Sequence, residues 1–135
     1  MRNSSNRDSS SALVIRADVS RLADMQEAAA RIKQQFGSLD VVFANAGIAQ
    51  PMPFSDVDAH NIDRQIDVNF KGVIYTVQSM LSLLNDPASI VLTSTTMIEK
   101  GVAGMSVYAA TKAAVRSLAR TLSAELAPRG VRVNT

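Results

Sequence analysis

The sequence contains no cysteine and no tryptophan, and it has a single histidine, His60. Without cysteine there is no disulfide, no thiolate metal ligand and no cysteine nucleophile. One histidine does not favour a multi-histidine metal site or a histidine-based catalytic triad. No apolar run approaches the roughly 20 residues of a membrane-spanning helix, and the apolar run at 12–15 is too short for a signal peptide. We therefore expect a cytoplasmic protein without a metal site.

An excess of charge of one sign is also lacking. The 135 residues carry a formal net charge of +2, with 14 basic and 12 acidic side chains. The densest basic group runs from Arg116 to Arg132, but Glu125 interrupts it and no aromatic residue lies within it. A nucleic-acid interface is therefore not expected. The hydrophobic fraction of 47% is that of an ordinary globular domain with a core.

Residues 1–11 are polar and low in complexity, which predicts a disordered tail. Beyond the tail, apolar and β-branched runs predict strands at 12–17, 39–44, 89–93 and 131–135. Amphipathic periodicity predicts helices between these strands, at 20–36, 59–84 and 107–127. This alternation is the signature of an α/β fold with a parallel sheet and right-handed crossovers.

Several details of the helices follow from single residues. Ser20 and Ser106 are expected to be N-caps, and Gly37 suits the position that follows the first helix. The apolar residues of the second helix trace one face, which we expect to meet the core. These residues are Ile62, Ile66, Phe70, Val73, Val77, Met80 and Leu84. Gly72 interrupts that face and predicts close packing, and the helix is expected to end at 85–87.

Polar residues come directly after three of the predicted strands. They are Asp18, the segment Asn45-Ala46-Gly47, and the pair Ser94-Thr95. In parallel α/β sheets, ligands bind beyond the carboxyl ends of the strands. These residues should therefore converge at one edge of the sheet, where Tyr108 opens the following helix.

Tyr108 and Lys112 lie one helical turn apart, on the face that also carries Val115, Ala119, Leu122 and Leu126. A lysine on a core-facing surface needs a partner. A cation held near a phenol favours the deprotonated oxygen, so this tyrosine could transfer a proton near neutral pH. The alternative is an interfacial tyrosine beside a lysine whose ammonium reaches the solvent.

Taken together, these motifs resemble those of the short-chain dehydrogenase/reductase family over residues 12–135. Ala17-Asp18-Val19 resembles the family's adenine-contacting acidic site, and Asn45-Ala46-Gly47 resembles its Asn-Asn-Ala-Gly motif, with Ala44 in place of the first Asn. Asp67-Val68-Asn69 matches the family's asparagine helix. Tyr108 and Lys112 match the catalytic pair, and the segment 132–135 matches a strand near the family's Pro-Gly turn.

The resemblance implies an NAD- or NADP-dependent oxidoreductase acting on a carbonyl or alcohol. Tyr108 would be the general acid or base, and Lys112 would assist it and hold the nicotinamide ribose. Asn69 would hold a water that links Lys112 to solvent; the alternative is that it only bonds a loop. Asp18, Val19, Asn45, Ala46 and Gly47 would contact the cofactor; for Asp18 the alternative is a cap of the next helix.

The family's substrate-binding serine corresponds here to Thr95. Threonine keeps the hydroxyl, and its methyl group narrows the pocket. Neighbouring strand residues face opposite sides, which favours Thr95, and Ser94 is the alternative if the local register lets it substitute.

The largest departure from the family is the missing glycine-rich phosphate turn. No Gly-x-x-x-Gly-x-Gly occurs in the sequence, and the strand at 12–17 corresponds to the family's third. The resemblance thus implies a three-layer Rossmann-like fold that lacks family strands 1 and 2 and the last strand. Residues 12–17 are then expected either to pair with 39–44 or to be poorly placed. Residues 39–44 should form an exposed edge.

Two functions remain open at this point. The first is the oxidoreductase with its Tyr-Lys proton relay and a small-molecule substrate. The second is a catalytically inactive fragment that retains only the helical dimerisation surface. In both cases the resemblance implies a homodimer or homotetramer formed through the helices 59–84 and 107–127.

Overall fold

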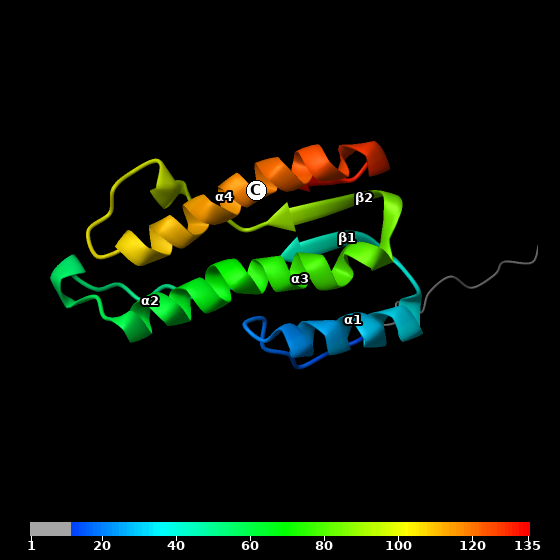
Figure 1. Ribbon diagram of the computed structural model, residues 1–135, viewed down its shortest axis with the longest axis horizontal. Helices are drawn as coiled ribbons and strands as arrows, with labels where there is room; N and C mark the ends of the chain where they lie inside the picture. The colour runs from blue at the N-terminus through cyan, green and yellow to red at the C-terminus, as the bar shows by residue number, and fades with distance from the viewer. Residues whose placement is uncertain (1–11) are drawn as a thin grey trace, which may run out of the picture.

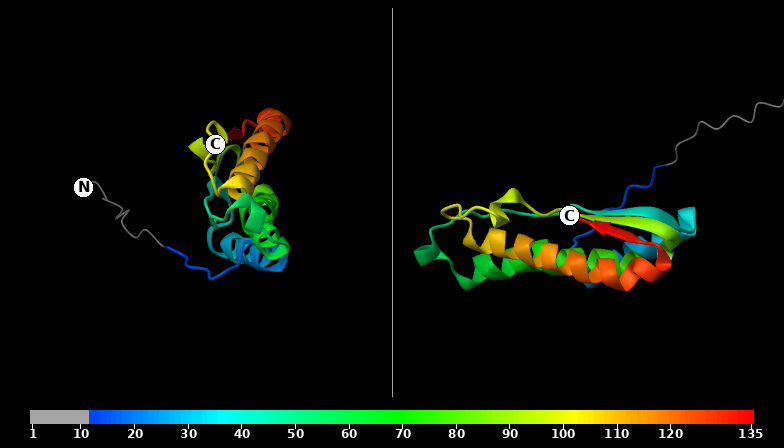
Figure 2. Two further views of the ribbon diagram at one scale, coloured as in Figure 1. Left: turned by 90° about the vertical axis from the view of Figure 1, so that its left-hand side faces the viewer. Right: turned by 90° about the horizontal axis from the view of Figure 1, so that it is seen from above.

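Three parallel strands form the sheet of the described chain in the order β1-β2-β3, and the main helices lie on one side of it (Figures 1 and 2). The computed structural model describes residues 12–135; the tail predicted at 1–11 lies outside the described residues. The strands are β1 (Leu39–Ala44), β2 (Leu84–Leu92) and β3 (Arg132–Asn134). The main helices are α1 (Leu22–Phe36), α2 (Ala59–Ile66), α3 (Gly72–Met80) and α4 (Ser106–Leu126). The predicted α/β fold with a parallel sheet is confirmed, as an incomplete Rossmann-like fold.

The core lies between the sheet and the helices. Its least exposed members are Ile90 and Leu92 on the central strand and Val115 on α4, each exposed by 1% or less. Because β2 has a neighbour on both sides and helices below, its alternate side chains are fully enclosed. No helix in the described part of the chain is long and apolar enough to cross a membrane.

The strand predicted at 12–17 does not form. These residues run extended beside α1, with Ile15 and Ala17 packed against the core, but they pair with no strand. Of the two expected outcomes, pairing with 39–44 is therefore wrong. An extended segment with alternating burial becomes a strand only where a neighbour accepts its backbone hydrogen bonds. Among the described residues, no strand lies beside 12–17 to accept these hydrogen bonds.

The outer strand β1 leaves its free edge open, as expected. It pairs only with β2 among the described strands. Val42 and Ala44 are buried toward the helices, whereas Val41 and Phe43 point to the uncovered face and are 58% and 60% exposed. The sheet therefore has one helical layer in this chain, where the full fold has two.

The helix predicted at 59–84 is interrupted by a π-helical turn at Asp67–Lys71. A π turn adds a residue, which rotates everything before it by about 100° relative to the helix that follows. As a result, the prediction of which residues face the core is wrong for the first half of the helix. Ile62 is 37% exposed, and the buried residues of α2 are instead Asn61 and Gln65.

Predicted element ends are partly confirmed. Gly37 follows α1 with φ 79°, and Gly72 marks close packing, since an added Cβ would lie 2.8 Å from Val19 Cγ2. The predicted N-caps are wrong, because Arg21 and Met105 occupy those positions. The hydroxyl of Ser20 bonds Asp18 instead. The segment 85–87 already belongs to β2, whose pairing with β1 is irregular there.

Candidate active site

The helix α4 carries Tyr108 and Lys112 beside the carboxyl end of β2. Lys112 is only 2% exposed, so it is not the largely solvated lysine that the alternative interpretation required. Its Nζ lies 6.0 Å from the centre of the Tyr108 ring and donates a 2.9 Å hydrogen bond to the backbone carbonyl of Thr93. Val115 and Ala119 continue the same face into the core, as predicted. The two side chains therefore lie next to each other at the edge of the sheet where ligands bind.

Lys112 is a buried cation without a carboxylate partner among the described ion pairs. Burial alone lowers its pKa from the ordinary 10.5. An ammonium has three N–H donors, and the described residues accept one of them, through Thr93. Such a group is expensive to bury for packing alone, which points to a functional role.

Asn69 and Gly47 form the wall beside this ammonium. A Cβ on Gly47 would lie 3.1 Å from Lys112 Nζ and 3.3 Å from Asn69 Oδ1. Asn69 is completely buried; its Oδ1 accepts from Ile48 N, and its Nδ2 donates to Ile48 O and to Thr111 Oγ1. Glycine allows the loop after β1 to approach the lysine this closely. The side chain of Asn69 thus bonds the loop, which is one of its two expected roles.

Asn45 and Ala46 lie on the other side of the same loop. The side-chain oxygen of Asn45 accepts a 2.9 Å hydrogen bond from the Thr93 hydroxyl, which ties the ends of β1 and β2 together. Asn45, Ala46 and Val19 also line one small groove of about 180 Å³ against α3. Val19, from the motif predicted to contact adenine, therefore lines the same groove as two residues of the Asn-Ala-Gly motif.

Asp18 stands apart from the other predicted residues. Its carboxylate accepts hydrogen bonds from the backbone N–H and the hydroxyl of Ser20, at 2.9 and 2.7 Å, and these bonds lower the pKa of Asp18. Its own N–H donates to Asp24 in the first turn of α1. Asp18 thus organises the turn before α1, in line with the structural alternative, although it is not the N-cap.

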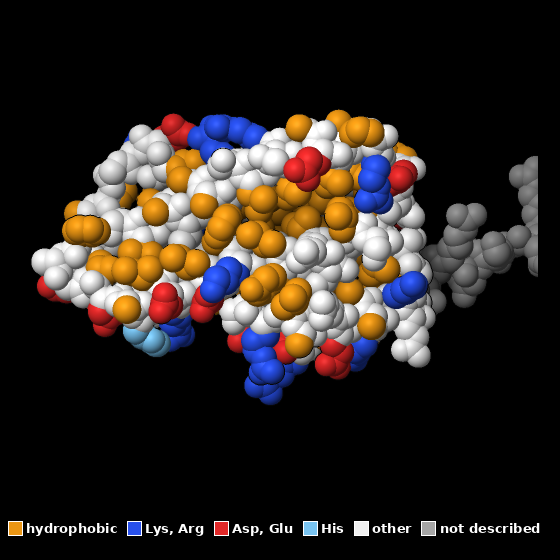
Figure 3. Space-filling view, viewed as in Figure 1, with side chains coloured by type: hydrophobic (Ala, Val, Ile, Leu, Met, Phe, Trp, Pro, Cys, Tyr) orange, Lys and Arg blue, Asp and Glu red, His pale blue; other side chains and the backbone are white. Residues whose placement is uncertain are grey.

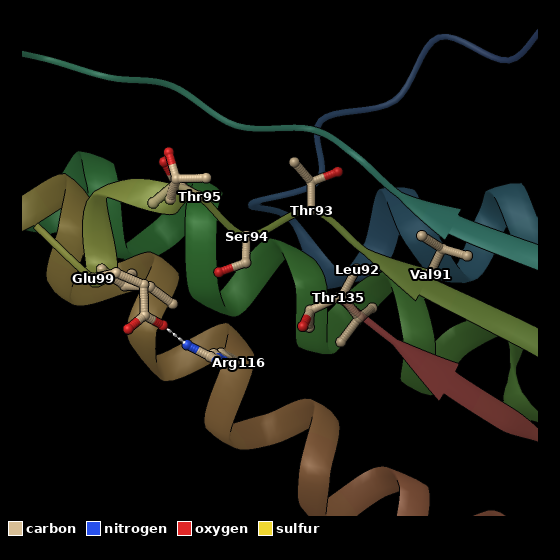
Figure 4. Close-up of a pocket in the computed structure, with 10 residues that line it drawn as sticks. Val91, Leu92, Thr93, Ser94, Thr95, Glu99, Arg116 and Thr135 are labelled. Atoms are coloured by element: carbon tan, nitrogen blue, oxygen red, sulfur yellow. Dashed lines mark hydrogen bonds and ion pairs between the residues drawn. The ribbon is translucent and has the colours of Figure 1, made fainter.

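Ser94 and Thr95 point to opposite sides of the chain, as Figure 4 shows. The Ser94 hydroxyl donates to the backbone carbonyl of Lys112 at 3.1 Å. Thr95 Oγ1 accepts from Met97 N at 3.3 Å, which leaves its own O–H without a partner among the described hydrogen bonds. Thr95 bonds neither Tyr108 nor Lys112 there. Nearby, Arg116 pairs with Glu99 across a cavity of about 530 Å³ (Figure 4).

Sequence reasoning missed the polar residues that support Asn69. Asn61, Gln65 and Thr111 are each 6% exposed or less, and hydrogen bonds connect them to one another, to Asn69 or to the loop after β1. A signal was present, because Asn61, Gln65 and Asn69 recur at a spacing of four. The apolar series at Ile62 and Ile66 masked it.

Known proteins resemble the whole described chain. A family model described as "Enoyl-(Acyl carrier protein) reductase" matches residues 3–135. A (-)-trans-carveol dehydrogenase of Rhodococcus erythropolis is 40% identical over 128 residues, covering 92% of this chain and 46% of that protein. The chain spans about half the length of the curated relatives it matches.

Solved structures agree with this result. A short-chain dehydrogenase/reductase of Brucella melitensis, titled glucose/ribitol dehydrogenase, superposes with a TM-score of 0.86 at 36% identity, covering 89% of this chain and 51% of that one. A short-chain dehydrogenase of Burkholderia cenocepacia in complex with NADP gives a TM-score of 0.85 at 35% identity, with coverages of 89% and 49%. The chain belongs to the short-chain dehydrogenase/reductase family.

Proposed function

We propose that this chain carries the catalytic half of an NAD- or NADP-dependent oxidoreductase that acts on a carbonyl or alcohol. The observation that carries the proposal is the buried ammonium of Lys112 beside the Tyr108 ring, which pairs with no carboxylate in the described part of the chain. This arrangement places a cation beside the side chain that the family resemblance assigns as the proton donor and acceptor. Tyr108 then donates a proton to a carbonyl oxygen in reduction and accepts one from an alcohol in oxidation.

Other side chains complete the proposed relay. Thr95 orients the substrate oxygen. Its O–H donates to no described residue, which supports this choice over Ser94, whose hydroxyl is engaged with α4. Asn69 keeps Gly47 and the loop after β1 against Lys112 through its bonds to Ile48. We assign to it also the water that links Lys112 to solvent, as the family resemblance implies.

The residues present fit the nicotinamide end of the cofactor. Lys112 has N–H donors left for ribose hydroxyls, and the bare backbone of Gly47 leaves a surface that a larger residue would fill. Asn45, Ala46 and Val19 line a groove that extends this surface toward the adenine end, and Asp18 precedes Val19 in the chain. A bound nicotinamide supplies or accepts the hydride. Relatives titled as complexes with NADP and NADPH support this cofactor class.

For the pyrophosphate of the cofactor, the sequence contains no glycine-rich turn of the kind that binds it in the family. This observation favours a second candidate function, an inactive chain that associates through its helices. An apolar groove of about 550 Å³ supports it. The groove runs between α2 and the start of α4, where Figure 3 shows apolar side chains gathered, and is lined mainly by Phe54, Ile62, Ile66, Phe70, Val107, Ala110 and Ala114. We propose that a second copy covers it.

Titration of NADH and NADPH against the purified chain, followed by cofactor fluorescence, separates the two functions. Micromolar binding supports the oxidoreductase, and its absence supports the inactive fragment. If cofactor binds, Tyr108→Phe should lower carbonyl reduction by about 10²–10⁴-fold while binding persists, because only the proton donor is lost. The control is Tyr75→Phe at the other tyrosine of the chain. Full activity in Tyr108→Phe would contradict the proposed relay.

A further inference from the structure

The side-chain amides of α2 and the π turn bind the backbone of the segment that follows β1. Asn69 accepts from Ile48 N at 2.8 Å and donates to Ile48 O at 2.9 Å. One turn earlier, Gln65 Oε1 accepts from Gln50 N at 3.3 Å, and two turns earlier, Asn61 Nδ2 donates to Gln50 O at 3.4 Å. Both the N–H and the C=O of Ile48 and of Gln50 are therefore bound by side chains of one helical face.

The bound segment has the geometry of a strand without a neighbouring strand. Burial alternates from residue 48 to residue 53, with Ile48, Gln50 and Met52 half-buried and the residues between them exposed. In a strand, every second residue directs its N–H and C=O to the same side. The helix thus supplies at residues 48 and 50 the donors and acceptors that a partner strand would provide. Met52 continues the series by donating to Gly104 O at 2.9 Å.

We infer that Asn61 and Gln65 are positioning residues that hold residues 48–50 extended and thereby keep Gly47 against Lys112. The inference rests on the proposed function for its catalytic meaning, since Gly47 and Lys112 form the proposed site. The structural part, that Asn61 and Gln65 hold residues 48–50, rests only on their hydrogen bonds to Gln50 and to each other.

The burial of this amide pair agrees with a specific role. Gln65 is 1% exposed and Asn61 4% exposed, and Gln65 Nε2 donates to Asn61 Oδ1 at 2.9 Å. This hydrogen bond therefore fixes the side chains of Gln65 and Asn61 in the orientation in which they bind the loop after β1. Replacing either amide by an apolar group leaves a backbone group of Gln50 without its hydrogen-bond partner. Apolar packing does not compensate for the free energy lost with that bond. The π turn is what directs these amides inward, because it rotates Ile62 and Ile66 away.

Amide hydrogen exchange of the full chain, measured by NMR, tests the inference without any cofactor. Gln65→Met keeps the side-chain length and should raise the exchange rate of Gln50 N–H by about tenfold. It should also shift the Lys112 Cε resonance, since the wall at Gly47 loosens. Arg64→Ala, at the exposed neighbouring position, is the control and should change neither.

Gln65→Glu provides the rescue. A protonated carboxyl accepts from Gln50 N and donates to Asn61 as the glutamine does, so at acidic pH it should restore the slow exchange. If Gln65→Met does not fold, Asn61→Ala replaces it, because it removes the anchor of Gln65 and one bond to Gln50.

Unchanged exchange at Gln50 and an unchanged Lys112 resonance in both variants would overturn the inference. Failure of the proposed function has a different signature, namely that the unmodified chain binds neither NADH nor NADPH while the exchange results stand. Where the chain is active, Gln65→Met should raise KM for the carbonyl substrate more than it lowers kcat, with Arg64→Ala unchanged.

Discussion

The α-carbon of Gly47 faces the ammonium of Lys112 so closely that a methyl group there would lie 3.1 Å from Nζ. Neither neighbour can withdraw, since Lys112 is bound to Thr93 and Asn69 to Ile48. Gly47→Ala should therefore lower the free energy of unfolding by about 1–2 kcal/mol, measured in urea. The matched control is Gly101→Ala, where a Cβ meets nothing within 4 Å. Equal stability of the two variants would contradict this packing.

Gly72 and Val19 make a second close contact, between α3 and the segment before α1. An alanine at position 72 would place its Cβ 2.8 Å from Val19 Cγ2. Gly72→Ala should cost about 1–3 kcal/mol in spite of the better helix propensity of alanine. Adding Val19→Ala should recover part of that cost, because it removes the clashing methyl group while Val19 Cβ, at 3.1 Å, remains. A double-mutant cycle in urea measures this coupling, and purely additive effects would refute it.

Burial of Lys112 makes stability depend on alkaline pH. Its pKa is lowered from 10.5, so between the lowered value and 10.5 the unfolded chain holds a proton that the folded chain has released. The free energy of unfolding therefore rises with pH over that interval. At lower pH the lysine is charged in both states, and the folded chain bears the full cost of burying the charge. Lys112→Met should remove this rise, as seen in urea titrations between neutral pH and 10.5.

Lys71 is the control for the pH experiment. It is an exposed lysine whose pKa is raised by the hydrogen bond and charge of Asp67, so its contribution changes only above 10.5. Lys71→Met should therefore keep the rise that Lys112→Met abolishes. A rise in both variants would assign the effect to another group.

The apolar groove between α2 and α4 predicts self-association. Ile66 lies on its lining, beside the exposed ring of Phe54. Ile66→Glu places a charge where a second copy would bury apolar surface, and it should convert a dimer to a monomer in sedimentation equilibrium. Leu22→Glu, at an exposed apolar residue on α1, serves as the control and should leave the mass unchanged. A monomeric unmodified chain would contradict the proposed interface.

Much of the fold could be predicted from periodicity and element order. The apolar runs at 39–44 and 89–93 and the face of α4 gave the right elements because each buries at least one face in the core. The approach of Lys112 to Tyr108 followed from helical spacing alone. The strand at 12–17 could not be judged in this way, since a strand depends on a partner that local sequence does not encode.

The face of α2 shows a second limit of sequence reasoning. Ile62 and Ile66 fit an unbroken helix of 3.6 residues per turn, so their pattern pointed to the core. One extra residue in the π turn at Asp67–Lys71 changes the phase, and Asn61 and Gln65 occupy that face instead. A local change of helix type of this kind is not revealed by any window of hydrophobicity.

The uncovered face of the sheet has a thermodynamic consequence. Val41 and Phe43 stay largely in water in the folded chain, so unfolding exposes less new apolar surface there than in a sheet covered on both sides. Exposed apolar surface dominates the heat capacity change of unfolding, ordinarily about 12–15 cal/mol/K per residue. For this chain the value should fall below that range. Its stability curve is then broad and shallow, so that cooling changes the stability of the folded chain only slightly.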